Sequence, residues 1–152
     1  MKILFTKTGN EEHVLSCKRD DGTISWLQVS DFFIAHDICH YAVETTIPLK
    51  DAFFGMINKG TAITDFALPK EQRNILFSEE ALFAEHLVNL LTIEYFQGKM
   101  DNFIEVFNST YNDTRMLSMI TEKKLEELRM NYGELMEKWR LLPMNETMTL
   151  IF

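Results

Sequence analysis

Two histidines stand four residues apart in the segment His36-Asp37-Ile38-Cys39-His40, and a carboxylate follows the first of them. In an α-helix each residue turns about 100° around the axis, so residues four apart lie about 40° from each other and about 6 Å apart along the axis. His36 and His40 would therefore share one face of a helix. Two imidazoles placed in this way can bind one metal ion, and imidazole is a common zinc ligand. The spacing predicts a divalent metal site, with zinc as the expected ion.

Apolar side chains surround the two histidines on the helical wheel. Phe32, Phe33, Val43 and Ile47 would flank the pair if the segment is helical. The histidines would then point into the protein and not toward bulk water. A metal ion lowers the pKa of a water molecule bound to it, which makes that water a nucleophile near neutral pH. The sequence therefore predicts a site able to support hydrolysis, without naming a substrate.

A catalytic zinc usually has three protein ligands and one open position, so a third ligand is expected. The long helix predicted after Ser78 supplies two candidates, Glu85 and His86. His86 lies on the face that we predict to be apolar, Glu85 lies on a neighbouring face, and either residue would complete the ligand set. Glu44 lies two turns, or about 12 Å, from His36 on the same helix, so it would replace His36 or support a ligand ring.

The segment resembles the active-site helix of zincin-type metallohydrolases, in which two histidines four residues apart bind zinc and a carboxylate follows the first. The resemblance implies that His36 and His40 are zinc ligands and that Asp37 is the general base for the metal-bound water. The position of the helix after a small predicted sheet is similar to the layout of that family. The match is confined to residues 36–44, and Asp37 is one methylene shorter than the glutamate of that family.

Two further resemblances involve the same residues. The stretch 33–38 is similar to the His-Asp pair of HD-domain phosphohydrolases, which are all-helical and place another histidine ligand on an earlier helix. Here the only earlier histidine is His13, in a β-like run. The pattern HDxxHYAVE, followed by Phe54-Gly55, is similar to a family of uncharacterised bacterial proteins that implies no activity.

A buried histidine pair also has a purely structural interpretation. Both rings would be hydrogen-bonded core groups, held by Asp37 or Glu44 with no metal involved. His86 could equally be a core residue, and Cys39 is expected to be a small buried hydrophobic residue because it points about 60° away from the first histidine. Metal content is the measurement that separates the two interpretations.

The elements that must position these residues are predicted from periodicity. Three β-like runs come first, and an Asp-Gly pair between the second and third favours a hairpin. The final residues, 145–152, alternate as a strand would and could return to the same sheet. The segments between are mainly helical, and 61–69 is expected to be irregular. The strands are expected at Ile3–Phe5, His13–Cys17 and Thr23–Val29, and the helices at Asp31 to about Thr46, Leu49–Asn58, Lys70–Phe77, Ser78 to about Gln97, Asp101–Tyr111 and Thr121–Leu142.

These elements predict an α+β fold, in which a small antiparallel N-terminal sheet packs on a mainly helical body. We expect the 152 residues to form one domain. The net charge of −8 argues against non-specific binding to nucleic acid or to an anionic membrane. No apolar stretch approaches the ~20 residues of a membrane span. With two cysteines and no signal-peptide pattern, a cytoplasmic protein with reduced thiols is expected.

A second hypothesis concerns the amphipathic segment Thr121–Leu142. Its apolar residues recur three and four apart, which is typical of a helix with one buried face. The face either covers the core of this chain or binds a partner or a second copy. In the second case the protein is a non-catalytic interaction or structural protein, for example a homodimer. The apolar residues of the stripe are Leu125, Leu128, Tyr132, Leu135, Trp139 and Leu142.

Overall fold

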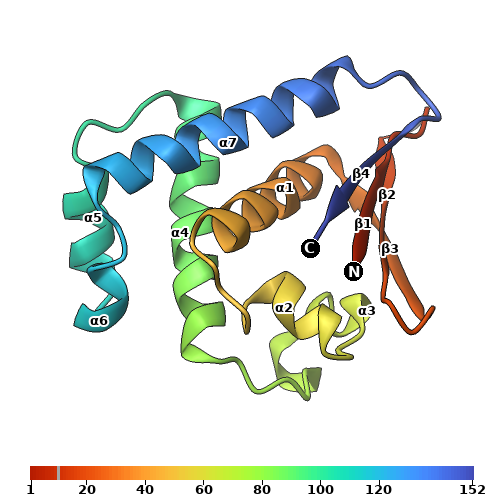
Figure 1. Ribbon diagram of the computed structural model, residues 1–152, viewed down its shortest axis with the longest axis horizontal. Helices are drawn as coiled ribbons and strands as arrows, with labels where there is room; N and C mark the ends of the chain where they lie inside the picture. Colours follow the sequence, from red (N-terminus) through yellow and green to blue (C-terminus); the bar gives the residue numbers. More distant parts are fainter. Residues whose placement is uncertain (10) are drawn as a thin grey trace.

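The computed structural model describes residues 1–9 and 11–152, and in these residues a four-stranded antiparallel sheet packs against a group of helices (Figure 1). The predicted α+β class is confirmed, with three N-terminal strands and one C-terminal strand. The sheet order is β3-β2-β1-β4, and the strands are β1 (Lys2–Thr6), β2 (Glu12–Lys18), β3 (Ile24–Ser30) and β4 (Thr147–Ile151). The helices are α1 (Asp31–Thr46), α2 (Phe53–Asn58), α3 (Ile63–Phe66), the 3₁₀ helix η1 (Lys70–Gln72), α4 (Glu79–Gln97), α5 (Phe103–Thr110), α6 (Thr114–Leu117) and α7 (Glu122–Leu141).

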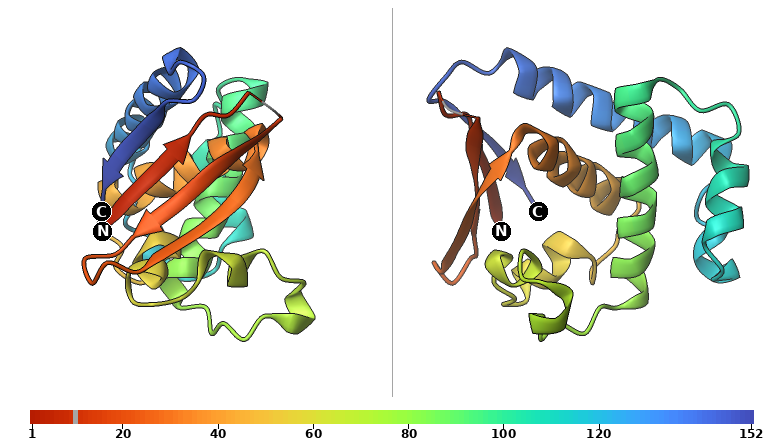
Figure 2. Two further views of the ribbon diagram at one scale, coloured as in Figure 1. Left: turned by 90° about the vertical axis from the view of Figure 1, so that its right-hand side faces the viewer. Right: turned by 180° about the vertical axis from the view of Figure 1, so that it is seen from behind.

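The sheet brings the two ends of the chain together, as the alternation of the last residues predicts. β4 pairs antiparallel with β1, with Phe5 opposite Met148, so the N- and C-termini lie side by side. The alternating residues Ile3, Phe5, Leu15 and Cys17 are fully buried and face the helices, which lie behind the sheet in the left view of Figure 2. This buried face of the sheet forms one wall of the core.

Helix α1 lies in the middle of the molecule. It packs against the sheet on one side and against α4 and α7 on others (Figure 1). Because neighbours surround it, side chains on several of its faces are buried, including Ile34, Ile38 and Val43, each 0% exposed. The near-continuous apolar character of residues 31–46 thus reflects a helix buried on most sides.

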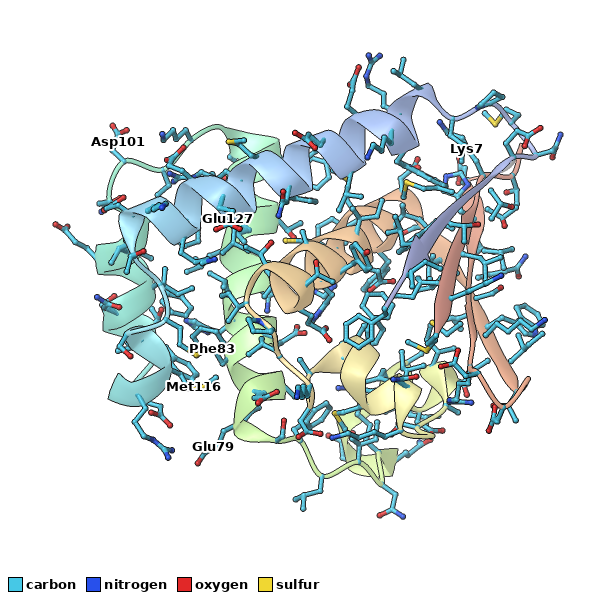
Figure 3. The ribbon with its side chains drawn as sticks, in the orientation of Figure 1. Lys7, Glu79, Phe83, Asp101, Met116 and Glu127 are labelled. Carbon is cyan, nitrogen blue, oxygen red and sulfur yellow. The ribbon has the colours of Figure 1, made fainter. Side chains whose placement is uncertain are left out.

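Two polar contacts fix α7 relative to its neighbours. Arg129 donates two hydrogen bonds to Glu94 of α4, each of 2.7 Å, in a largely buried pair. Lys7, labelled in Figure 3, donates through Nζ to the carbonyl oxygens of Trp139, Arg140 and Leu142 at the end of α7. A lysine at this position satisfies carbonyls that have no partner within the helix and complements its dipole. α4 and the sheet are therefore both held to α7.

The apolar stripe of α7 covers the core of this chain. Leu125, Leu128 and Leu135 are 1%, 0% and 8% exposed, and α7 packs directly on α1. A change such as Leu128→Glu would place a charge in this core. The hypothesis of a partner-binding or homodimer helix would therefore need a different surface of α7.

Three of the predicted local segments differ from the structure. The helix expected from Leu49 begins only at Phe53, because the amides of Lys50 and Asp51 donate to Glu80 of α4 in place of a helical pattern. Of the helix expected at 70–77 only η1 forms, and none of residues 71–77 is fully buried, with Leu76 94% exposed. The stretch expected to be irregular, 61–69, contains the one-turn helix α3.

Two glycines should respond to alanine with opposite signs. A Cβ atom on Gly55 in α2 would overlap the backbone carbonyl of Lys50, so Gly55→Ala should destabilise the fold by about 1–3 kcal/mol. A Cβ atom on Gly133 in α7 would meet nothing within 4 Å, so Gly133→Ala should stabilise the helix by about 0.5–1 kcal/mol. Urea denaturation of both variants measures the difference. Equal effects would contradict the close packing of α2 on residue 50.

Among the described residues, no helix combines the length and the apolar character needed to cross a membrane. Both cysteines are free and buried. Burial raises the pKa of the Cys17 thiol to about 12. The Sγ atom of Cys39 faces the carbonyl oxygen of Val88 at 4.0 Å. Cys39 therefore belongs to the contact between α1 and α4.

Candidate metal centre

The two histidines of α1 lie side by side on one face of the helix, as their spacing predicts. Their ring centroids are 4.9 Å apart in an edge-to-face arrangement. The side chain of His36 is 13% exposed and that of His40 is 3% exposed. The pair therefore lies where the buried middle of the molecule meets its surface.

Glu85 of α4 completes a group of three potential ligands. Its Oε1 lies 3.7 Å from Nε2 of His36, and its Oε2 lies 3.2 Å from Nε2 of His40. One ligand atom from each of the three residues falls within 4.8 Å of the other two, so the group could hold a metal ion. Asn89, one turn further along α4, donates to Glu85 Oε1 at 3.1 Å and orients the carboxylate. The contact between α1 and α4 therefore assembles the candidate centre.

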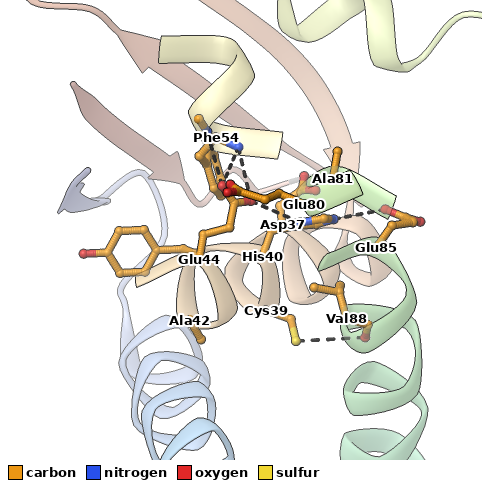
Figure 4. Close-up of polar contacts among 12 residues, drawn as sticks. Asp37, Cys39, His40, Ala42, Glu44, Phe54, Glu80, Ala81, Glu85 and Val88 are labelled. Atoms are coloured by element: carbon orange, nitrogen blue, oxygen red, sulfur yellow. Dashed lines mark hydrogen bonds and ion pairs between the residues drawn. The ribbon is translucent and has the colours of Figure 1, made fainter. Parts of the chain in front are cut away.

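Each histidine also has a carboxylate beside its other ring nitrogen. Nδ1 of His36 lies 3.6 Å from Oδ1 of Asp37, and Nδ1 of His40 lies 3.3 Å from Oε1 of Glu44. Neither contact is a hydrogen bond, because the first is too long and the second is not aligned. Figure 4 shows His40 between Glu44, from its own helix, and Glu85, from α4. Each ring thus lies between two carboxylates. In both rings Nε2 faces Glu85, which the two histidines share.

Glu44 connects the candidate centre to the start of α2. Its side chain is fully buried, and its carboxylate accepts hydrogen bonds from the amides of Phe54, at 3.0 and 3.2 Å, and Gly55, at 3.2 Å. These amides begin a helix and have no partner within it. Of the two roles predicted for Glu44, replacing His36 or supporting a ligand ring, its buried carboxylate beside Nδ1 of His40 has the position of the second.

The charges in the centre stabilise one another. Burial alone would lower the pKa of His36, but the nearby carboxylates of Asp37 and Glu85 outweigh it and raise this pKa to about 9. The pKa of His40 is also raised, since Glu44 and Glu85 outweigh its burial and the charge of His36. The two imidazoles lower the pKa of Glu85, whose Oε2 is hydrogen-bonded to Nε2 of His40 at 3.2 Å. In the metal-free protein, a proton on the His36 ring therefore competes with a cation for this centre.

Of the two candidates for the third ligand, the structure brings only Glu85 to the histidines. The Nε2 atom of His86 lies 2.6 Å from Oγ1 of Thr110, and its ring packs against Phe107 and Tyr111. His86 therefore belongs to the contact between α4 and α5. The prediction that included His86 in the metal site is not supported by this placement.

Asp37 and His13 both lie outside the group of three potential ligands. Asp37 contacts Nδ1 of His36, whereas Glu85 faces Nε2 of the same ring. His13 is buried in β2, its Nε2 is 2.7 Å from Oδ1 of Asp31, and its ring packs on Trp139. Asp37 therefore has an orienting contact with the ring of a potential ligand, His36. His13 has a structural contact, with Asp31.

Comparison of the chain with protein-family models, with curated proteins and with solved structures finds no match. The interpretation of the centre therefore depends on its own geometry.

Proposed function

We propose that this chain binds one divalent metal ion through His36, His40 and Glu85, and that the ion is zinc. The observation that carries the proposal is the pair of carboxylates behind the rings: each Nε2 faces Glu85 while each Nδ1 faces Asp37 or Glu44. In metal sites, the imidazole nitrogen that does not bind the ion usually contacts a carboxylate or carbonyl, which fixes the ring. Two histidines and one glutamate are also the donor set of several catalytic zinc sites.

We further propose that the ion activates water for hydrolysis. Three protein ligands leave one position of a tetrahedral zinc ion for water, and zinc lowers the pKa of that water to about 7. The Glu85 side chain is 54% exposed, which supports access of solvent and substrate to this position. Water bound there could attack a polarised carbonyl or phosphoryl group. The contact of Asp37 with His36 supports a positioning role for Asp37, in place of the general-base role implied by the zincin resemblance.

Metal analysis with two neighbouring variants tests the proposed ligands. Protein purified without a tag and equilibrated with zinc should retain about one equivalent. Glu85→Ala should weaken zinc binding more than about 100-fold, because it removes a direct ligand, whereas loss of a supporting carboxylate typically costs 10–100-fold. His86→Ala is the matched control, one residue away on α4, and should bind zinc as the unchanged protein does. Equal affinity of all three proteins would overturn the proposed centre.

Hydrolysis is tested separately, with p-nitrophenyl acetate and bis(p-nitrophenyl) phosphate as model substrates. Activity on one of them should disappear with a chelator and return with zinc in the unchanged protein, but not in Glu85→Ala. Zinc binding at one equivalent with no chelator-sensitive turnover of either compound would leave the metal site in place and reject hydrolysis of these substrate classes.

A further inference from the structure

Exposed aromatic side chains adjoin the candidate centre. Phe32 and Phe33 of α1 and Phe96 of α4 are 54%, 53% and 57% exposed. The rings of Phe32 and Phe33 lie 6.5 and 6.4 Å from the His36 ring, and Phe32 stacks on Phe96 at 6.1 Å. We refer to these three residues as the aromatic patch. Single exposed apolar residues are common, but a group of them beside a site with converging polar groups is typical of ligand binding.

The charges of the centre select against anionic ligands. In the described part of the chain, the hydrogen bonds and ion pairs of Asp37, Glu44 and Glu85 come from the two histidines, from Asn89 and from backbone amides, with no Lys or Arg side chain among them. Sites for phosphate and carboxylate groups usually present Arg or Lys to the anion. A phosphoryl substrate would meet three carboxylates here and only the metal ion as a cation.

We infer that the centre takes a neutral carboxylic ester or amide whose apolar acyl or aryl group lies on the aromatic patch. This inference rests on the proposed metal site and narrows its substrate class from carbonyl or phosphoryl groups to carbonyl groups. In the reaction, the oxygen of the metal-bound water forms a bond to the carbonyl carbon. The bond from that carbon to the leaving oxygen or nitrogen breaks, and a proton from the water passes to the leaving group. The products are a carboxylic acid and an alcohol or amine.

Hydroxamic acids test the inference without knowledge of the natural substrate, because they bind zinc through two oxygens. Isothermal titration of the zinc-loaded full chain should give a Kd for benzohydroxamic acid about tenfold lower than that for acetohydroxamic acid, since the phenyl ring loses contact with water on the aromatic patch. A carboxylate added to the far end of the phenyl ring should abolish this gain, because it places a negative charge near the patch and the acidic centre.

Two variants connect the gain to the aromatic patch. Phe32→Ala/Phe96→Ala should bring the Kd of benzohydroxamic acid close to that of acetohydroxamic acid. Trp26→Ala is the matched control, because Trp26 on β3 is equally exposed, at 58%, and belongs neither to the ligand group nor to the aromatic patch; it should keep the full preference. Equal Kd values for both compounds in protein that holds one zinc would overturn the inference and leave the metal site intact. Protein that holds no zinc would instead overturn the proposed function.

Discussion

Zinc should raise the melting temperature of this protein far more at about pH 8.5 than at about pH 6.5. The pKa of His36 is about 9, so this ring holds its proton at neutral pH, and the pKa of His40 is raised by Glu44 and Glu85. Zinc binds only the neutral rings, so apparent affinity changes about tenfold per pH unit for each proton displaced. Across two pH units, one displaced proton corresponds to about a 100-fold gain in apparent zinc affinity. Tighter binding to the folded state raises the melting temperature by mass action.

The metal-free protein should show the opposite trend, which makes the measurement specific. The pKa of His36 in the folded state lies above its unfolded value of about 6.5, so its contribution to stability is complete below that pH. The contribution is lost as the pH rises through about 9. The melting temperature without zinc should therefore fall over the interval in which the zinc increment grows.

Thermal unfolding followed by circular dichroism, at a free zinc concentration held constant by a chelator buffer, measures both trends. The control is His36→Ala/His40→Ala, which should show no zinc increment at either pH. If an increment survives both replacements, zinc binds elsewhere and the centre is wrongly identified. The spacing of the histidines alone suggests release of the ion only below the ordinary imidazole pKa of about 6.5. The three carboxylates around the rings move the expected interval upward.

The elements around the centre could be predicted because their patterns are local. The alternation of residues 145–152 and the apolar runs before residue 30 indicate strands without reference to the rest of the chain, and a helix that begins after Ser30 places His36 and His40 on one face. The start of α2 could not be predicted in this way. It depends on the carboxylate of Glu80, which accepts the amides of Lys50 and Asp51 from about 30 residues away.

The choice between Glu85 and His86 depends on which face of α4 meets α1. Apolar residues occur on several faces of this helix, and Leu82 and Ile93 among them are 54% and 44% exposed. The face that packs on the core is formed by Ala84, Leu87, Val88 and Leu91, each at most 2% exposed. Neighbouring helical residues differ by about 100° in direction, so the rotation of α4 about its own axis decides whether Glu85 or His86 faces α1. The sequence alone does not determine this rotation of α4.

Replacing the buried glutamate behind His40 should cause the largest loss of stability. Glu44→Ala leaves the amides of Phe54 and Gly55 without their acceptor and removes the carboxylate beside Nδ1 of His40. Breaking a buried charged pair by removing one partner typically costs about 3–5 kcal/mol. Glu44→Gln keeps the shape and one oxygen acceptor, so its loss should be smaller, at about 1–3 kcal/mol. Urea denaturation without metal measures both.

The same substitution should weaken zinc binding, which separates a role in the centre from a role in folding alone. Carboxylates that contact the far nitrogen of a ligand histidine typically contribute 10–100-fold to metal affinity, so Glu44→Gln should raise the Kd for zinc by about that factor. Glu80→Gln is the matched control, because Glu80 also accepts two backbone amides, at 2.7 and 2.8 Å, but lies outside the ligand group. It should lower stability without changing zinc affinity. If both variants bind zinc as the unchanged protein does, Glu44 supports only the start of α2, and the proposed orientation of His40 toward a metal loses its main support.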